Sequence, residues 1–335
     1  MKYATWLYRA LKPSLLKHLI AVALCTGTLG SFSVTHAHNW PQRAVKLILP
    51  FGPGSGTDTA ARLLGESLST RWGHPVIVEN RPGGDGLVAI TSFLSAADDH
   101  VLLYASTASF IAHPFVHEKL SYALDRDLQP IARVSNTIMA IATPAAAEYK
   151  DITDFTARAR AEPDKHNVSG AAGLPEFTVD AFVKSNKLVV SKVPYRDVTQ
   201  AARDLGENRI QFLLTSYAVV RPLVEAGKIR VLAIGGAQRS SALPDIPTAS
   251  EAGFPELSIE TTSGLYGRAG MAAELRRRIA ADVIAAAQDR TIAVRITATG
   301  QDMVPAGPEE LAQTLTRQTA KAAEVAQIVG LQRKK

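Results

Sequence analysis

Cysteine is nearly absent from this sequence, and its scarcity excludes several kinds of chemistry. The 335 residues contain a single cysteine, Cys25, and aromatic residues make up only 6% of the chain. The remainder can therefore form no disulfide, carry no thiolate nucleophile and offer no cysteine ligand to a metal. Clusters of basic residues interleaved with aromatic residues are also missing, which argues against nucleic acid as a partner.

The first 37 residues have the pattern of a secretory signal peptide. With histidine taken as neutral, their charged side chains are all basic: Lys2, Arg9, Lys12 and Lys17. A basic start, a short apolar run over 19–34 and the small-residue end at Ala37 are typical of an export signal. The run is short for a membrane span of about 20 apolar residues and is interrupted by glycine, serine and threonine. We therefore expect cleavage after Ala37 and a periplasmic location, without lipid attachment because Leu24 precedes the cysteine.

The positive charge of the chain belongs largely to this segment. The whole sequence carries a net charge of +6, whereas 33 basic and 31 acidic residues remain once residues 1–37 are removed. A nearly neutral protein lacks the excess of basic residues that binds the phosphates of nucleic acid. The net charge, like the absence of basic clusters, therefore argues against nucleic acid as a partner.

Beyond the signal segment, short apolar runs alternate with helical patterns. Strands are predicted at 45–49, 76–79, 101–105, 138–142, 188–190, 210–214 and 230–234. Helices are predicted at 58–72, 86–96, 151–161, 176–186, 197–206, 217–227, 271–288 and 308–328. Such alternation predicts an α/β protein whose parallel sheets are covered by helices on both faces.

The glycine-rich segment 50–58, PFGPGSGTD, joins the first predicted strand to the first predicted helix. It lacks the lysine of a P-loop and the glycine spacing of a dinucleotide fingerprint, and Ser55 has glycine directly on both sides, unlike a nucleophile elbow. Two interpretations remain open. One is a tight turn with Thr57 or Asp58 capping the helix; the other is a cradle of backbone N–H groups for a compact anion such as a carboxylate.

Residues that could support a metal or a catalytic triad are present without the necessary arrangement. His113 and His117 are four residues apart, but Pro114 lies between them and no third ligand is evident. Ser55 or Ser106 would need a partner such as His166, and no spacing supports that triad. We therefore expect no metal site, no cofactor and no catalytic residue.

Several motifs in order along the chain point to one family. They are Trp40-Pro41, the segment 50–58, Glu79–Gly84, Val193–Arg196, Glu225–Ala233, Leu243–Thr248 and Glu251–Pro255. Together they resemble the Bug-type extracytoplasmic solute receptors, the substrate-binding proteins of tripartite tricarboxylate transporters. The resemblance implies a two-lobed periplasmic-binding-protein fold of type II, with two doubly wound sheets joined by a two-crossing hinge. Lobe 1 would comprise 38–138 and 258–335, and lobe 2 would comprise 139–257.

The resemblance also implies a function and its partners. A monomeric receptor would capture a small organic carboxylate or an amino acid in the cleft between the lobes and deliver it to a tripartite-type membrane permease. Alternatives are a carboxylate receptor that serves a sensor protein in signalling, and an α/β hydrolase.

The same resemblance places the ligand-binding residues on four turns. In lobe 1 they are Phe51, Gly54, Ser55, Gly56, Thr57 and Asp58, followed by Ser106 and Thr107. In lobe 2 they are Ala171, Ala172, Gly173, Glu176, Phe177, Thr215 and Ser216. This chain departs from the family pattern in lobe 2, where Pro175 removes an N–H donor and Glu176 would repel a second ligand carboxylate. The departures suggest a monocarboxylate or a zwitterion, with Phe177 packing on its apolar part.

Overall fold

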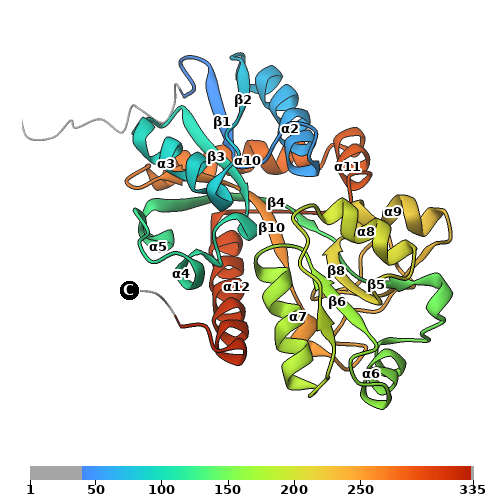
Figure 1. Ribbon diagram of the computed structural model, residues 1–335. Helices are drawn as coiled ribbons and strands as arrows, with labels where there is room; N and C mark the ends of the chain where they lie inside the picture. Colours follow the sequence, from blue (N-terminus) through green and yellow to red (C-terminus); the bar gives the residue numbers. More distant parts are fainter. Residues whose placement is uncertain (1–39, 333–335) are drawn as a thin grey trace, which may run out of the picture. The chain divides into compact units, whose positions relative to one another are not determined.

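The computed structural model describes residues 40–332, and the described residues from Pro41 onward belong to one compact unit (Figure 1). The predicted signal peptide lies outside the described residues. None of the helices between residues 40 and 332 is both long and apolar enough to cross a membrane.

The first sheet has six strands in the order β11-β4-β10-β3-β1-β2. Their bounds are β1 Val45–Leu49, β2 Val76–Asn80, β3 Val101–Ser106, β4 Leu128–Thr137, β10 Thr261–Arg268 and β11 Gln301–Ala306. Strand β1 pairs in parallel with β2 and β3, whereas β10 is antiparallel to β3 and β4, and β11 is antiparallel to β4. We call this sheet and its helices lobe 1.

The helices of lobe 1 are α2 Gly56–Trp72, α3 Leu87–Ala96, α4 His113–Val116, α5 Leu124–Asp127, α10 Ala273–Ala287, α11 Arg290–Thr297 and α12 Pro308–Val329. Helix α2 illustrates why these segments are helical. Buried Ala61, Leu64 and Leu68 recur at three- and four-residue spacing. Gly73 then ends the helix in the left-handed conformation that favours glycine.

The second sheet has five strands in the order β7-β6-β8-β5-β9 and forms lobe 2. The strands are β5 Met139–Pro144, β6 Asn167–Gly170, β7 Ser191–Lys192, β8 Phe212–Ser216 and β9 Ile229–Ile234; the helices are α6 Ile152–Ala161, α7 Leu174–Ser185, α8 Val198–Gly206 and α9 Tyr217–Glu225. Phe212 packs against both Phe155 and Phe182, with ring centroids 5.0 and 5.2 Å away, which anchors α6 and α7 on the sheet.

The chain passes from the first sheet to the second at Ile138 and returns between Ile234 and Thr261. Hydrogen bonds hold the crossings together: the Gly235 N–H donates to the Met139 carbonyl next to the first crossing (2.8 Å), and within the returning crossing the Ile259 N–H donates to the Gly235 carbonyl (2.9 Å). This arrangement supports, as a proposal, the division of the chain into 38–138 plus 258–335 and 139–257.

The structure corrects several predicted elements. Both sheets are mixed rather than parallel, because β10 and β5 run antiparallel to their neighbours. The predicted strand at 188–190 does not form; the edge strand β7 begins three residues after the predicted start, and Val189 is 51% exposed. Strands β4 and β11 and helix α11 were not predicted, since Pro130, Arg133 and Pro305 interrupt the apolar pattern of the two strands.

Candidate functional site

Ser55 caps the helix that follows the first turn. Its Oγ accepts a hydrogen bond from the Asp58 N–H at 3.2 Å, and α2 begins at Gly56. The prediction that Thr57 or Asp58 is the cap is therefore wrong. The helix starts two residues earlier than expected, because the extended backbone of Ser55 places its hydroxyl over the first turn.

Asp58 holds the turn in shape. Its side chain is 4% exposed and accepts hydrogen bonds from the Gly54 N–H (2.9 Å), Asn80 Nδ2 (2.8 Å) and Arg62 Nε (3.1 Å). Burial by itself would raise the pKa of Asp58, but the hydrogen bonds from Arg62, Asn80 and Gly54 outweigh it, and the pKa lies below its ordinary value. The carboxylate thereby ties the glycine-rich loop to both α2 and β2.

The turn leaves backbone donors at a positive helix end. The first N–H groups of an α-helix have no acceptor within the helix, and the helix dipole makes that end attractive to anions. In α2 these positions are Gly56 and Thr57, one half-buried and the other buried. Phe51 is half-buried beside them, and its carbonyl accepts a hydrogen bond from Asn80 (2.9 Å).

Ser106 and Thr107 lie at the same edge of the first sheet, because β3 runs parallel to β1 and both strands end there. Both side chains are buried. The Thr107 hydroxyl accepts a hydrogen bond from the Thr262 N–H (2.9 Å), which ties the end of β3 to β10. The structure thus brings together all the predicted lobe 1 residues.

The predicted lobe 2 residues likewise gather at one edge of the second sheet. Strands β6 and β8 are parallel, so the turn Ala171–Gly173 and the pair Thr215 and Ser216 follow neighbouring strand ends. The Ala171 N–H donates to the Leu214 carbonyl (2.9 Å), and Ala172 is exposed. Gly173 has a φ of 88° and precedes α7.

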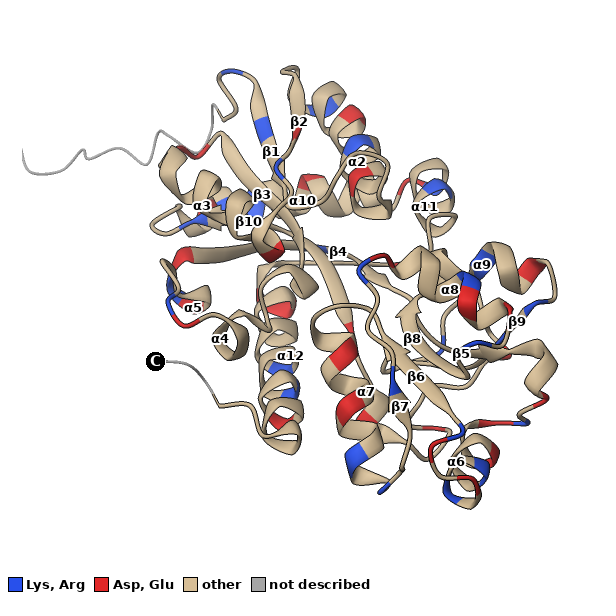
Figure 2. Ribbon diagram, in the orientation of Figure 1, with Lys and Arg blue, Asp and Glu red and all other residues tan. Residues whose placement is uncertain are grey.

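Glu176 is paired with a lysine of its own lobe. Lys192 on β7 lies 2.9 Å from a Glu176 carboxylate oxygen and 2.7 Å from an Asp180 oxygen. In Figure 2 the basic segment of β7 lies beside the acidic segments of α7. Burial would lower the pKa of Lys192, but its hydrogen bonds to Asp180 and Glu176 raise it above the ordinary value. The sequence did not suggest this partner, because Lys192 is 16 residues away along the chain. Phe177 is half-buried and packs against the hydrophobic core.

One segment of lobe 1 contacts the helix starts of both lobes. Gln301 Nε2 donates to the Gly56 carbonyl at the start of α2 (2.9 Å). The neighbouring Gly300 carbonyl accepts from the Ile138 N–H (3.1 Å), and the Ile138 carbonyl accepts from the Tyr217 N–H at the start of α9 (2.7 Å). The turn before α2 in lobe 1 and the end of β8 in lobe 2 are therefore connected through residues 300 and 301 and the crossing at Ile138.

Two of the candidate histidines, His113 and His166, pack inside the protein. His113 is buried, with Nδ1 2.8 Å from the Tyr122 hydroxyl and Nε2 2.9 Å from the Asp85 carbonyl. His166 packs against Phe155 in lobe 2, whereas Ser55 and Ser106 belong to lobe 1. Within residues 40–332, no group of three His, Cys, Asp or Glu side chains could hold a metal ion.

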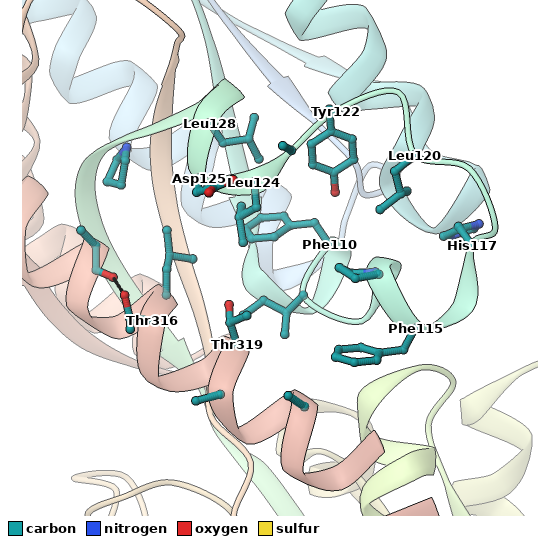
Figure 3. Close-up of a pocket in the computed structure, with 18 of the residues that line it drawn as sticks. Phe110, Phe115, His117, Leu120, Tyr122, Leu124, Asp125, Leu128, Thr316 and Thr319 are labelled. Atoms are coloured by element: carbon teal, nitrogen blue, oxygen red, sulfur yellow. Dashed lines mark hydrogen bonds between the residues drawn. The ribbon is translucent and has the colours of Figure 1, made fainter. Parts of the chain in front are cut away.

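A cavity of about 1080 Å³ lies elsewhere in lobe 1, between the segment 110–130 and α12 (Figure 3). Its walls are mainly apolar, including Phe110, Leu124 and Leu315. None of the predicted ligand-binding residues lines it. Its apolar lining makes it a poor match for a small carboxylate, which needs polar donors.

Comparisons with known proteins identify relatives of this chain both in sequence and in fold. A family model described as "Tripartite tricarboxylate transporter family receptor" matches residues 60–331. A UPF0065 protein of Bordetella bronchiseptica is 28% identical over 289 residues, covering 86% of each chain. MatC from Rhodopseudomonas palustris, solved with bound malate, is 26% identical with a TM-score of 0.70, covering 85% of this chain and 99% of that one. The periplasmic binding protein BugD is 22% identical with a TM-score of 0.69, covering 88% and 99%. This likeness confirms the predicted periplasmic-binding-protein fold.

Proposed function

The chain belongs to the tripartite tricarboxylate transporter family of receptors, and on that basis we propose that it captures a small organic carboxylate between its lobes in the periplasm and delivers it to a membrane permease. The family consists of solute receptors, which confirms the prediction that the protein is not an enzyme. A receptor serving a sensor protein would use the same binding site and differ only in its partner.

One observation carries the proposal. The glycine-rich turn before α2 and the turns after β6 and β8 offer backbone N–H groups and hydroxyls at the ends of the two sheets, and hydrogen bonds through Gln301, Gly300 and Ile138 connect the turn before α2 with the one after β8. Such groups suit a carboxylate, because several donors can share its two oxygens. We assign ligand binding to Phe51, Gly54, Ser55, Gly56, Thr57, Asp58, Ser106, Thr107, Ala171, Ala172, Gly173, Glu176, Phe177, Thr215 and Ser216, with Asp58 acting by shaping the turn.

The ion pair with Lys192 changes the expected ligand. A bare Glu176 would favour a ligand ammonium, but Lys192 already supplies the opposite charge. A ligand with one or two carboxylates therefore becomes as acceptable as a zwitterion. MatC is a relative solved with malate, so malate is the first ligand to test.

A thermal-unfolding screen tests the proposal. Malate, succinate, citrate, lactate, benzoate and glutamate are each added to the purified protein, and the melting temperature is followed against concentration. A true ligand stabilises the folded state by RT ln(1 + [L]/Kd), about 2.7 kcal/mol at one hundred times Kd. We expect at least one acid to do so.

Ala172→Trp supplies the matched control for that screen. Ala172 is exposed on the β6–α7 turn, so an indole there fills the proposed binding space without entering the core. The stabilising acid should lose its effect on this variant. If no acid stabilises the wild type, or if the variant responds equally, the proposed site is wrong.

Replacing Lys192 by methionine should weaken carboxylate binding. The change leaves the Glu176 charge without its 2.9 Å partner, and an unscreened like charge near a ligand carboxylate costs about 1–2 kcal/mol at an effective dielectric between protein surface and water. We expect Kd to rise about tenfold by titration calorimetry.

Two further variants isolate the charge effect. Adding Glu176→Gln to Lys192→Met should restore the affinity, because the repelling carboxylate is then absent. Lys184→Met removes an exposed lysine from the same helix, α7, and should leave Kd unchanged. Weak binding in the double variant would show that the unpaired Glu176 charge is not the cause of the loss.

A further inference from the structure

Gln301 lies behind the glycine-rich turn, at the start of β11, and its side chain is almost fully enclosed. Only 2% of the residue is exposed. It belongs to none of the four turns that the sequence predicted as ligand-binding, and it contacts the first of them from 245 residues further along the chain. A buried glutamine has to satisfy two N–H donors and one carbonyl oxygen, so its contacts define its orientation.

All three polar groups of the Gln301 amide are hydrogen-bonded. Nε2 donates to the Gly56 carbonyl (2.9 Å) and to the Thr299 hydroxyl (2.9 Å), and Oε1 accepts from the Ser135 hydroxyl (2.6 Å). The Thr299 hydroxyl donates its own proton to the Ile296 carbonyl (2.7 Å), so it can only accept from Gln301. A flipped amide would turn its oxygen toward the Gly56 carbonyl, which has no proton to give. The orientation of the Gln301 side chain is therefore fixed.

The backbone around this side chain is packed tightly against the starts of α2 and α9. A Cβ on Gly56 would lie 3.2 Å from the Thr299 carbonyl oxygen. Gly300 has a φ of 81°, and a Cβ there would lie 3.0 Å from the Ala218 Cβ in α9. The segment 299–301 thus has little freedom to move relative to the start of either helix.

The Gly56 carbonyl belongs to the same peptide group as the Thr57 N–H. A peptide group is planar and trans, so its C=O and N–H bonds point in opposite directions. A donor that holds the Gly56 carbonyl therefore also fixes the direction of the Thr57 N–H. The same hydrogen bond polarises the peptide group and strengthens its N–H as a donor.

The Thr57 N–H is one of the donors that α2 cannot use itself. No hydrogen bond within residues 40–332 engages it, whereas the next N–H, that of Asp58, donates to Ser55. Thr57 keeps 9% of its surface exposed, beside the half-buried Gly56. A donor at the start of a helix suits an anion, because the helix dipole favours negative charge there. The strength of that contact depends on the direction of the N–H bond.

We propose that Gln301 is a positioning residue of the carboxylate site: it aims the Thr57 N–H at a carboxylate oxygen of the ligand without touching the ligand itself. The proposal rests on the receptor function proposed above and adds to it a residue outside the four turns. It explains why a buried amide donates to a helix start that Ser55 already caps. An apolar side chain of the same size would fill the space but leave the peptide group free to tilt.

Titration calorimetry of Gln301→Met tests the proposal. Methionine is unbranched like glutamine but has no N–H, so the bond to the Gly56 carbonyl is lost. The probes are the six acids of the thermal-unfolding screen: malate, succinate, citrate, lactate, benzoate and glutamate. We expect Kd for the tightest-binding acid to rise about tenfold, the factor that corresponds to one hydrogen bond.

Ser135→Ala is the matched control for that variant. Ser135 is fully buried and bonds the opposite end of the same amide, so its removal loses a buried hydrogen bond but keeps the one to Gly56. Urea denaturation should show both variants to be less stable than the wild type, whereas Kd should rise only in Gln301→Met. Equal Kd values in the two variants would show that Gln301 supports the fold and does not position the donor.

The amide signal of Thr57 in proton–nitrogen correlation NMR spectra gives a readout on the wild type itself. A charged acceptor strengthens the hydrogen bond and moves the amide proton downfield. Saturation with the tightest-binding acid should therefore shift Thr57 further downfield than any other amide of α2, and less so in Gln301→Met. If the Thr57 signal stays in place although the acid binds, the proposal fails and the receptor function stands. If none of the six acids binds the wild type, the receptor function fails and the role of Gln301 with it.

Discussion

The Gly170→Ala variant is expected to lose carboxylate binding and to unfold more easily than the wild type. A Cβ at this position would lie 2.7 Å from the Glu176 Cα, 2.8 Å from the Pro175 carbonyl oxygen and 2.9 Å from the Glu176 nitrogen. All three are backbone atoms, so the start of α7 has to move as a unit. Overpacking of this kind costs about 1–3 kcal/mol.

The displacement acts directly on the proposed site, because Gly173 and Glu176 belong to the displaced segment. We expect urea denaturation to show the loss of about 2 kcal/mol in unfolding free energy, and calorimetry to show at least a tenfold rise in Kd for the acid found by the screen. Wild-type affinity in this variant would mean that the β6–α7 turn does not hold the ligand.

Gly206→Ala is the matched control within the same lobe. Gly206 is the last residue of α8, and an added Cβ would meet only side-chain atoms at 3.6–3.8 Å, which is ordinary contact. A helical alanine is favoured over glycine by about 0.5–1 kcal/mol. This variant should be as stable as the wild type or slightly more stable, with unchanged binding.

Asp58→Ala is expected to lower the free energy of unfolding by about 3 kcal/mol. Removing one partner of a buried charge network typically costs about 3–5 kcal/mol. The lower end of that range applies because Arg62 is partly exposed and water can solvate its charge. The Gly54 N–H and Asn80 lose their acceptor, and the loop before α2 loses its shape. Carboxylate affinity should fall with it. Chemical denaturation measures the first effect and calorimetry the second, with the exposed Glu66→Ala on α2 as control.

The stability difference should depend on pH in a defined direction. The pKa of Asp58 is lower in the folded protein than in the unfolded chain, so its contribution is fully present above the unfolded value of about 4 and is lost as pH falls through the folded value. The gap between wild type and Asp58→Ala should therefore narrow below about pH 4. A gap that stays constant there would show that the ionised carboxylate is not responsible.

Local sequence patterns predicted most helices because a helix depends on the apolar spacing and the end residues of its own segment. Helices α2, α6 and α12 begin and end within two residues of their predicted bounds. Helix α11 was missed although Asp289 caps it, accepting from the Thr291 and Ile292 N–H groups. A capping aspartate before an eight-residue segment was the available signal, but its β-branched residues obscure the helical pattern.

The remaining features depend on residues far apart along the chain. Strand β4 pairs with β10 and β11, more than a hundred residues later, and that pairing makes a strand of a sequence interrupted by Pro130 and Arg133. The partner of Glu176 is likewise non-local: Lys192 reaches it only because β7 lies beside α7. The sequence predicted that the segment containing Ser55 forms a turn before a helix. Which of its residues caps the helix could not be predicted, because it depends on the backbone conformation of the turn.

The position of β4 in the first sheet affects how the chain folds during synthesis. Its two neighbours in the sheet are β10 and β11, and the whole of lobe 2 is synthesised before either of them. During synthesis and before folding is complete, β4 therefore has two unpaired edges, while β5 to β9 already contain everything their own sheet requires. Unpaired strand edges are sites of aggregation. Truncation before residue 261 should thus leave a folded lobe 2 attached to an open, self-associating half-sheet.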